Sequence, residues 1–369
     1  MAQAPGKSFR KGLTIIQLMD MFPTEESART WFEGLIWADG RHCPHCGSTK
    51  TTECDKEKTH PMPYRCNDCK LYFSARIGTV MEDSRLPFRK WVLAIYLHMT
   101  SLKGVSSMKL HRDIGVTQKT AWFMLQRIRE AFRRDDDNDL MGGPVEVDET
   151  YMGGRRKNMH GKKRREAEGR GPVDMTAVVG AKDRTKNEVR AQVVDRTDAA
   201  TLVPFVEGNA AHGAQVYTDD ARAYSSLATM LNGFSHESVN HSAGEYVRDQ
   251  AHTNGIESFW SVLKRAHKGV YHKFSVKHLQ RYVTDFAGRH NVRTQDTLAQ
   301  MECIVSGMVG KRLTYKALKA NNGLPSGARS WASGFMYPRF LFSRLNPDSG
   351  RVLLLRRLHG PHKRMRFDM

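Results

Sequence analysis

One short segment of the chain carries an amide, a carboxylate and a basic residue at helical spacing. Asn254 and Glu257 are three residues apart on one helix face, and Lys264 follows Glu257 by seven residues, or two helical turns. Two acids that follow expected strands, Asp148 and Asp219, could complete a metal site with them. Phosphodiester chemistry with two Mg²⁺ ions, about 3.5–4 Å apart, needs a few carboxylate or amide ligands from different elements. The five residues therefore indicate a metal-dependent enzyme that acts on nucleic acid.

Each of these residues also has an ordinary structural interpretation. Asn254 and Glu257 fit the N-x-x-E pattern of a capping box, which needs no chemistry. The two upstream acids could be solvated charges at strand ends. Alternation along a strand puts Asp148 and Glu149 on opposite faces, so at most one of them is expected in a given cleft. Lys264 could bind a DNA phosphate as a point charge, or simply be an exposed lysine.

Two C-x-x-C pairs lie near the N-terminus. Cys43 and Cys46 form the first pair and Cys66 and Cys69 the second, with 19 residues between the pairs. This spacing is typical of a zinc ribbon, in which four thiolates hold one structural Zn²⁺ tetrahedrally. The alternative is two unrelated pairs of buried thiols. Six cysteines in 369 residues do not make a disulfide scaffold, so the other two are expected to be ordinary thiols.

The charge of the chain favours a polyanionic partner. The formal net charge is +19 and the isoelectric point is about 9.8, which favours nucleic acid over a generic basic protein. No apolar run approaches the roughly 18–20 residues that span a bilayer, and the basic N-terminus is not followed by the apolar stretch of a secretory signal. We therefore expect a protein inside the cell, with no membrane partner.

The elements that must position these residues begin with a helical segment at residues 86–134. A short helix would end near Asp113, Gly115 would make a turn, and Thr117 would cap a second helix, which resembles a helix-turn-helix. The alternative is a small helical bundle with solvated charges. The side chains left for DNA on the second helix are Gln118, Lys119, Trp122, Gln126 and Arg129.

Beyond an acidic run at residues 135–139 the pattern changes to α/β. Val145 and Val147 alternate in a strand expected to end near Asp148, and a basic arm at residues 155–170 would follow it. Further strands are expected at 176–180, 188–194, 215–218 and 238–241, and helices at 198–207, from 254, and at 276–291.

Three motifs in this order resemble bacterial insertion-sequence transposases with an ISXO-like catalytic domain. They are V-E-V-D-E-T-Y-M-G-G, V-Y-T-D-D-A-R-A-Y and H-T-N-G-I-E-S-F-W-S-V-L-K-R. The segment from F-P-T-E-E-S-A through the cysteine pairs fits as well, and the resemblance covers roughly residues 12–318. It implies an α/β catalytic domain of RNase H-like fold, with a mixed sheet flanked by helices and an active site of the acidic-triad class.

The resemblance also implies roles for individual residues. Asp148 and Asp219 would be the first two ligands of two Mg²⁺ or Mn²⁺ ions. The third ligand would be Asn254 or Glu257, because the family's third ligand can be counted as an asparagine or a glutamate and both are present here. Lys264 matches the basic residue that follows the third ligand.

The expected organisation has five parts. They are an N-terminal helical segment (1–40), a zinc ribbon (41–80), a helix-turn-helix-like DNA-binding segment (86–134), an RNase H-like domain (144–318) and a flexible basic tail (319–369). The expected function is a DNA transposase that binds terminal inverted repeats, cuts them and transfers them to target DNA, as a homodimer or larger assembly. The alternatives are a non-catalytic DNA-binding regulator and a repair nuclease on the same scaffold.

Overall fold

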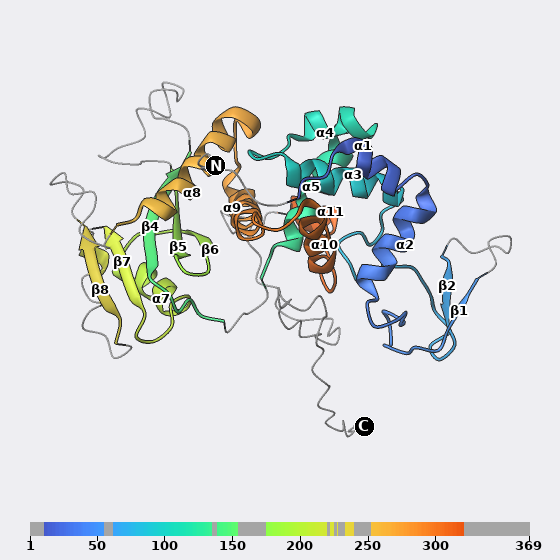
Figure 1. Ribbon diagram of the computed structural model, residues 1–369, viewed down its shortest axis with the longest axis horizontal. Coiled ribbons are helices and arrows are strands. Elements are labelled where there is room, and N and C mark those ends of the chain that lie inside the picture. Colours follow the sequence, from blue (N-terminus) through green and yellow to red (C-terminus); the bar gives the residue numbers. More distant parts are fainter. Residues whose placement is uncertain are drawn as a thin grey trace, which may run out of the picture. The chain divides into compact units, whose positions relative to one another are not determined.

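A computed structural model gives the fold of most of the chain (Figure 1). The expected basic arm and all but the first two residues of the expected tail lie outside the described residues. No helix in the described part of the chain is both long and apolar enough to cross a lipid bilayer. The described residues are 11–54, 62–134, 139–153, 175–219, 222–224, 227, 233–239 and 252–320.

The N-terminal part is helical and carries a small antiparallel sheet. Thr117 caps α5 and Gly115 ends α4 with φ 61°, in the left-handed region that favours glycine, both as predicted, and Thr24 caps α2. The helices are α1 (Ile15–Met21), α2 (Glu25–Ile36), α3 (Phe88–Thr100), α4 (Ser107–Ile114) and α5 (Gln118–Ala131). The strands are β1 (Thr51–Glu53), β2 (Tyr64–Cys66) and β3 (Tyr72–Phe73).

A helix from far along the chain completes the core of these helices. α10 (Thr297–Gly307) contributes Met301, Ile304 and Val305 to the buried cluster that contains the apolar faces of α2, α3 and α5. The residues expected in the catalytic domain, 144–318, are therefore divided between this core and two further cores, one on each face of the large sheet.

The large sheet has five strands in the order β6-β5-β4-β7-β8. β4 pairs antiparallel with β5, which pairs antiparallel with β6, whereas β4, β7 and β8 are parallel. This confirms the expected α/β class with a mixed sheet flanked by helices. The strands are β4 (Val145–Met152), β5 (Thr176–Asp183), β6 (Glu188–Val194), β7 (Gln215–Asp219) and β8 (Ser235–Val239).

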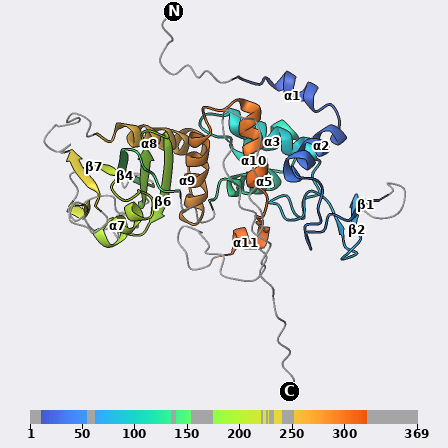
Figure 2. The same ribbon diagram turned by 60° about the horizontal axis from the view of Figure 1, so that its bottom comes forward.

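Helices cover both faces of this sheet because its central strands alternate apolar side chains. Val179 and Ala181 of β5 join a core with α7 (Ala199–Glu207), whereas Val178 joins a core with α8 and α9. α8 lies beside β4 in both views (Figure 1, Figure 2). The remaining helical elements are α8 (Asn254–Ala266), the π-helical η5 (His267–Tyr271), α9 (Val276–Asn291), α11 (Tyr315–Lys319) and the 3-10 turn η2 (Arg222–Tyr224).

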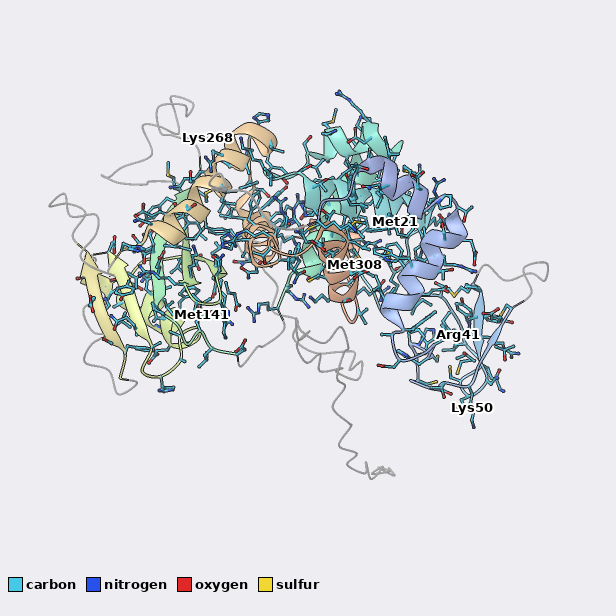
Figure 3. All side chains as sticks on the ribbon, in the orientation of Figure 1. Met21, Arg41, Lys50, Met141, Lys268 and Met308 are labelled. Carbon is cyan, nitrogen blue, oxygen red and sulfur yellow. The ribbon has the colours of Figure 1, made fainter. Side chains whose placement is uncertain are left out.

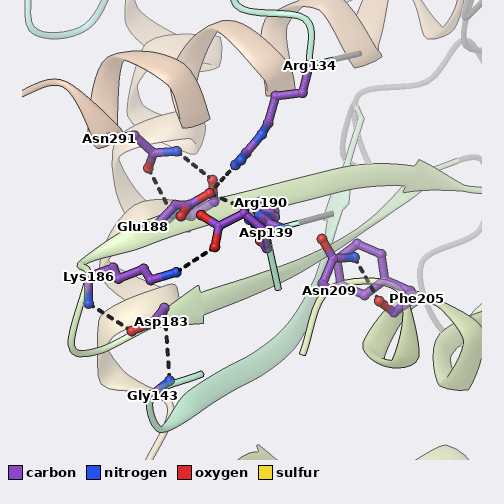
Figure 4. Close-up of polar contacts among 11 residues, drawn as sticks. Arg134, Asp139, Gly143, Asp183, Lys186, Glu188, Arg190, Phe205, Asn209 and Asn291 are labelled. Carbon is purple, nitrogen blue, oxygen red and sulfur yellow. Dashed lines mark hydrogen bonds and ion pairs between the residues drawn. The ribbon is translucent and has the colours of Figure 1, made fainter. Parts of the chain in front are cut away.

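The segment that enters β4 is tied to neighbouring strands by polar contacts (Figure 4). The Asp139 carboxylate accepts from Lys186 Nζ at 3.1 Å, and its carbonyl oxygen accepts from Arg190. The Gly143 N–H donates to the Asp183 carboxylate at 3.3 Å. These contacts fix the start of β4 and therefore the position of the acids that it carries.

The prediction that the first strand ends near Asp148 is wrong. β4 continues to Met152 and pairs with β5 over its whole length. On its other side, pairing with β7 ends at Glu146 and Tyr217. The strand can continue through its polar residues because β5 pairs with the β4 backbone along the whole strand. Beyond Glu146 the other edge of β4 is no longer paired with β7, which leaves space there for acidic side chains.

The predicted DNA-contacting face of α5 is mostly covered. Gln126 and Arg129 are buried, with 0% and 1% of their surface exposed, so their expected availability to DNA is wrong. The Trp122 ring packs against Tyr315 of α11, with centroids 6.5 Å apart. Only the first turn of α5, with Gln118 and Lys119, remains exposed.

Candidate active site

Asp148 and Asp219 approach each other because their strands are parallel neighbours. Glu146 is the register partner of Tyr217, and two residues further along both strands stand the two acids. One oxygen of each of Asp148, Asp219 and Glu149 lies within 4.8 Å of the others. The sheet therefore brings together the two predicted acids, Asp148 and Asp219, and adds the carboxylate of Glu149, which was not among the predicted ligands.

Asp148 and Glu149 point to opposite faces of β4, yet both reach the same cluster. The Trp260 indole N–H of α8 donates to the Asp148 carboxylate at 3.1 Å. The Tyr224 hydroxyl, which belongs to the α7-side core, donates to Glu149. Both acids also line one pocket, so the expectation that at most one enters a given cleft is wrong. Because the two side chains start on opposite faces of β4, Asp148 bonds to Trp260 and Glu149 bonds to Tyr224. The two carboxylates still meet, because β7 is no longer paired with β4 at this point.

The three carboxylates are electrostatically strained without a cation. Burial, and next the charge of Asp219, raises the pKa of Asp148 to about 6 and the pKa of Glu149 to about 8. Mg²⁺ and Mn²⁺ prefer such oxygen ligands, and a divalent cation removes the repulsion between them. The donor set thus fits a divalent metal, which Asp148 and Asp219 would hold together with a further carboxylate.

The start of α8 is capped from the sheet rather than by a capping box. The N-cap is Thr253, Asn254 is the first helical residue, and the Thr253 side chain makes no capping hydrogen bond to a backbone N–H of the helix. Instead the buried Glu146 carboxylate of β4 accepts from the Ile256 N–H at 2.8 Å. The Thr253 hydroxyl donates to the Glu257 carboxylate at 3.0 Å. The capping-box interpretation is therefore wrong, because an acid on the strand satisfies the helix end.

Two glycines allow α8 to lie this close to the sheet. A Cβ on Gly255 would stand 2.7 Å from a Glu146 carboxylate oxygen, and one on Gly180 would stand 2.7 Å from the Trp260 ring. Both distances are well inside van der Waals contact, so a side chain at either position would push α8 away. The glycines thus set the distance between Trp260 and the acid that it bonds.

Glu257 and Lys264 line the same pocket as Asp148 and Glu149, and Asn254 does not line it. The pocket is open, with a volume of about 480 Å³. The Glu257 charge is also among the causes that raise the pKa of Asp148. The residues that line the pocket are Asp148, Glu149, Thr150, Glu257, Trp260, Ser261, Lys264, Arg265 and Lys268.

Sequence reasoning missed several residues of this pocket. Glu149 was not expected beside Asp148, because strand alternation is a local rule. It takes no account of the point at which the neighbouring strand β7 diverges from β4. Trp260 was not singled out, because nothing in its local sequence indicates that its indole N–H bonds to an acid on the strand. Arg265 and Lys268 carried a signal that could have been used, since they continue the spacing of Glu257 and Lys264 along one helix.

The four predicted cysteines form a compact cluster in the small sheet. The Cys43 and Cys69 sulfurs are 3.7 Å apart, and the Cys46 and Cys66 sulfurs are 3.6 Å apart. Four ligands at the Zn–S distance of about 2.3 Å in a tetrahedron are separated by about 3.8 Å. The cluster therefore fits a structural zinc held by four thiolates.

Comparison with known proteins identifies the class. A profile of the ISXO2-like transposase domain matches residues 140–291, and a profile of the transposase zinc-ribbon domain matches residues 23–71. The chain is 30% identical over 272 residues to an uncharacterised protein in transposable element ISH50 of Halobacterium salinarum, covering 68% of this chain and 86% of that protein. The chain therefore belongs to the ISXO2-like family of insertion-sequence transposases, which confirms the resemblance seen in its motifs.

A solved structure was also found to be similar. It is the simian T-cell lymphotropic virus intasome in complex with the PP2A regulatory subunit B56 gamma, of which one chain matches 71% of this chain over 85% of its own length. The sequence identity is 13% and the TM-score is 0.23.

Proposed function

We propose that the protein cuts DNA at the terminal inverted repeats of its own insertion sequence and joins the freed ends to target DNA. The supporting observation is one pocket lined by the Asp148 and Glu149 carboxylates of β4 and by cations of α8, with the Asp219 carboxylate of β7 within 4.8 Å of both acids. Cutting would break a P–O3′ bond with water and leave a 3′-OH. Joining would use that 3′-OH to attack a target phosphorus and release the target's own 3′-oxygen. Both steps are in-line displacements, so one RNase H-like site can serve both.

The residues of the pocket divide into holding and positioning roles. When bound, two Mg²⁺ or Mn²⁺ ions would stabilise the entering and leaving oxygens. Asp148 and Asp219 would hold them, and Trp260 positions the Asp148 carboxylate through its hydrogen bond. Glu257 is the best candidate for the further carboxylate, with Glu149 as a fourth. Lys264 would bind a phosphate oxygen as a point charge.

Recognition of the ends would fall to the N-terminal half of the chain. The zinc ribbon and the exposed first turn of α5, with Gln118 and Lys119, are the surfaces that support this part of the proposal. A structural zinc would hold the ribbon in shape. Since two ends must be cut and joined in concert, we propose a homodimer or larger assembly on DNA, acting at the bacterial nucleoid.

Exchange of the two candidates for the third ligand should have unequal effects. Glu257→Gln should lower Mg²⁺-dependent DNA cleavage by at least about tenfold, because Glu257 lines the pocket beside Asp148. Asn254→Ala should change it by no more than about twofold, as expected for a surface position. Single-turnover cleavage rates of the two variants, at equal melting temperature, measure this. Equal losses in both, or a greater loss in Asn254→Ala, would assign the third ligand to Asn254.

Stabilisation by Mg²⁺ should grow with pH. The pKa values of Asp148 and Glu149, about 6 and about 8, lie above their unfolded values. Their contribution to stability is therefore full below about pH 4 and is lost as pH rises through those values. Mg²⁺ binds the deprotonated carboxylates and should restore the loss, adding about 2.7 kcal/mol at about 100 times its Kd. Thermal melts with and without Mg²⁺ at about pH 5 and about pH 8 test this, and a pH-independent shift would place Mg²⁺ elsewhere.

The simplest test of the proposed activity is nicking. The full chain is incubated with Mg²⁺ and a supercoiled plasmid that carries both ends of the element. We expect nicks at the element boundaries that require Mg²⁺ and disappear with a chelator. Specific binding without any nick would instead support the regulator.

A further inference from the structure

The pocket described above continues away from the acids along one face of α8. Ser261, Lys264, Arg265 and Lys268 follow Glu257 by four, seven, eight and eleven residues, and all of them line the pocket. This is the spacing of a single helical stripe. The buried residues of the helix, among them Leu263 and Ala266, lie on its other side. The stripe therefore faces the pocket and solvent, and the sheet lies behind it.

The three cations of this stripe, Lys264, Arg265 and Lys268, are not expected to stabilise the fold. All three are exposed, and no ion pair to Lys264, Arg265 or Lys268 is recorded among the described residues. Like charges three to four residues apart on a helix repel each other and reduce its stability by some tenths of a kcal/mol. Several other arginines of the described chain do form an ion pair, as Arg184 does with Glu146 at 2.7 Å. The unneutralised stripe indicates an anionic ligand.

The far end of the stripe is held in place by packing. Lys268 lies in the π-helical turn η5, at the end of α8 (Figure 3). The last residue of that turn, Tyr271, accepts from Arg129 Nη2 at 3.3 Å and packs edge-to-face against Tyr282, with ring centroids 5.0 Å apart. Gly104 leaves room for the Tyr271 hydroxyl, since a Cβ there would collide with it. A π-helical turn placed this firmly often marks a functional position.

We infer that the stripe of Ser261, Lys264, Arg265 and Lys268 binds the phosphate backbone of one DNA strand as it leaves the carboxylate cluster. The inference rests on the proposed function, and it adds the path and the direction of the strand. From Glu257 to Lys268 the helix rises by about 16 Å at about 1.5 Å per residue. One DNA strand carries a phosphate about every 3.4 Å along the duplex axis, so the stripe covers about five nucleotides on one side of the cut. Its contacts are to phosphates and carry no base preference.

The test compares Arg265→Ala/Lys268→Ala with wild type in DNA binding at varied salt, without Mg²⁺, on a random-sequence duplex. Each lost phosphate contact lowers the slope of log K against log salt by about 0.9, so the double variant should lose about 1.8. The matched control is Lys273→Ala, an exposed cation that does not line the pocket, and it should keep the slope. Arg265→Lys/Lys268→Arg should also keep it, because the charge is retained. Equal melting temperatures exclude a folding defect.

The position of the strand is tested with neutral methylphosphonate linkages placed one at a time around the cleavage point. Wild type should lose affinity for linkages within about five nucleotides on one side only, and the double variant should be insensitive to those same linkages. An unchanged salt slope, or sensitivity equal on both sides, would overturn the inference. Neither result bears on the proposed function, which fails separately if wild type leaves end-containing DNA uncut.

Discussion

We expect Asp148→Asn or Asp219→Asn to lower Mg²⁺-dependent cleavage of end-containing DNA by about 10³-fold or more. Each substitution would remove one charge from a cluster of carboxylates whose oxygens lie within 4.8 Å of one another. Metal ions in such sites supply several kcal/mol of transition-state stabilisation, and about 1.4 kcal/mol corresponds to a tenfold change in rate. Single-turnover cleavage by the full chain, at saturating DNA, measures the effect.

Both Asp148→Asn and Asp219→Asn should leave the fold intact. A loss of cleavage in a folded variant indicates a catalytic rather than a structural role for the aspartate. Removing one of three crowded carboxylates relieves repulsion, so the metal-free variants should melt at the same temperature as wild type or higher near pH 8. The matched control is Glu237→Gln, an exposed acid on β8, the strand beside β7, and it should cleave normally. Full cleavage by either aspartate variant would remove these residues from the active site.

Asp285→Ala should destabilise the protein by about 3–5 kcal/mol, the usual cost of removing one partner of a buried ion pair. Asp285 of α9 is fully buried and accepts from His98 of α3 at 2.7 Å and from Arg129 of α5 at 3.3 Å. Burial opposes its ionisation, but His98 and the arginines outweigh burial and lower the pKa of Asp285 below its ordinary range. The exchange leaves the buried Arg129 guanidinium without its carboxylate.

Urea unfolding of the metal-free protein measures this cost. The matched control is Asp195→Ala, an exposed acid on the loop after β6, which should shift stability by less than about 0.5 kcal/mol. Because the pKa of Asp285 is lowered, its contribution is present above its unfolded pKa and is lost only in strong acid. A cost below about 1 kcal/mol near pH 7 would mean that the network does not hold α3, α5 and α9 together.

The elements that carry strong local signals could be predicted from the sequence. The helix expected at 276–291 has the observed bounds, because its apolar residues recur at helical spacing and pack on the sheet. The strand at 188–194 is also as predicted. The cysteine spacing was sufficient for the ribbon, since metal geometry constrains it directly.

What depended on tertiary contact could not be predicted. The amphipathic pattern of α5 showed one buried face, but the polar Gln126 and Arg129 are buried as well. Helices from far along the chain pack on α5: Asp285 of α9 pairs with Arg129, and Tyr315 of α11 packs on Trp122. The role of Glu146 as the acceptor at the start of α8 joins residues 110 positions apart. The inclusion of Glu149 in the acid cluster depends on where β7 diverges from β4, which no local pattern encodes.

Strand transfer is the measurement that tests the central claim most directly. A labelled DNA end with a free 3′-OH is incubated with the full chain, Mg²⁺ and an unlabelled plasmid, and joined products are separated by size. We predict labelled plasmid from wild type and none from Asp148→Asn, with equal binding of the end by both. Hydrolysis without joining would indicate the repair nuclease, and binding without either reaction would contradict a catalytic role for Asp148 and Asp219.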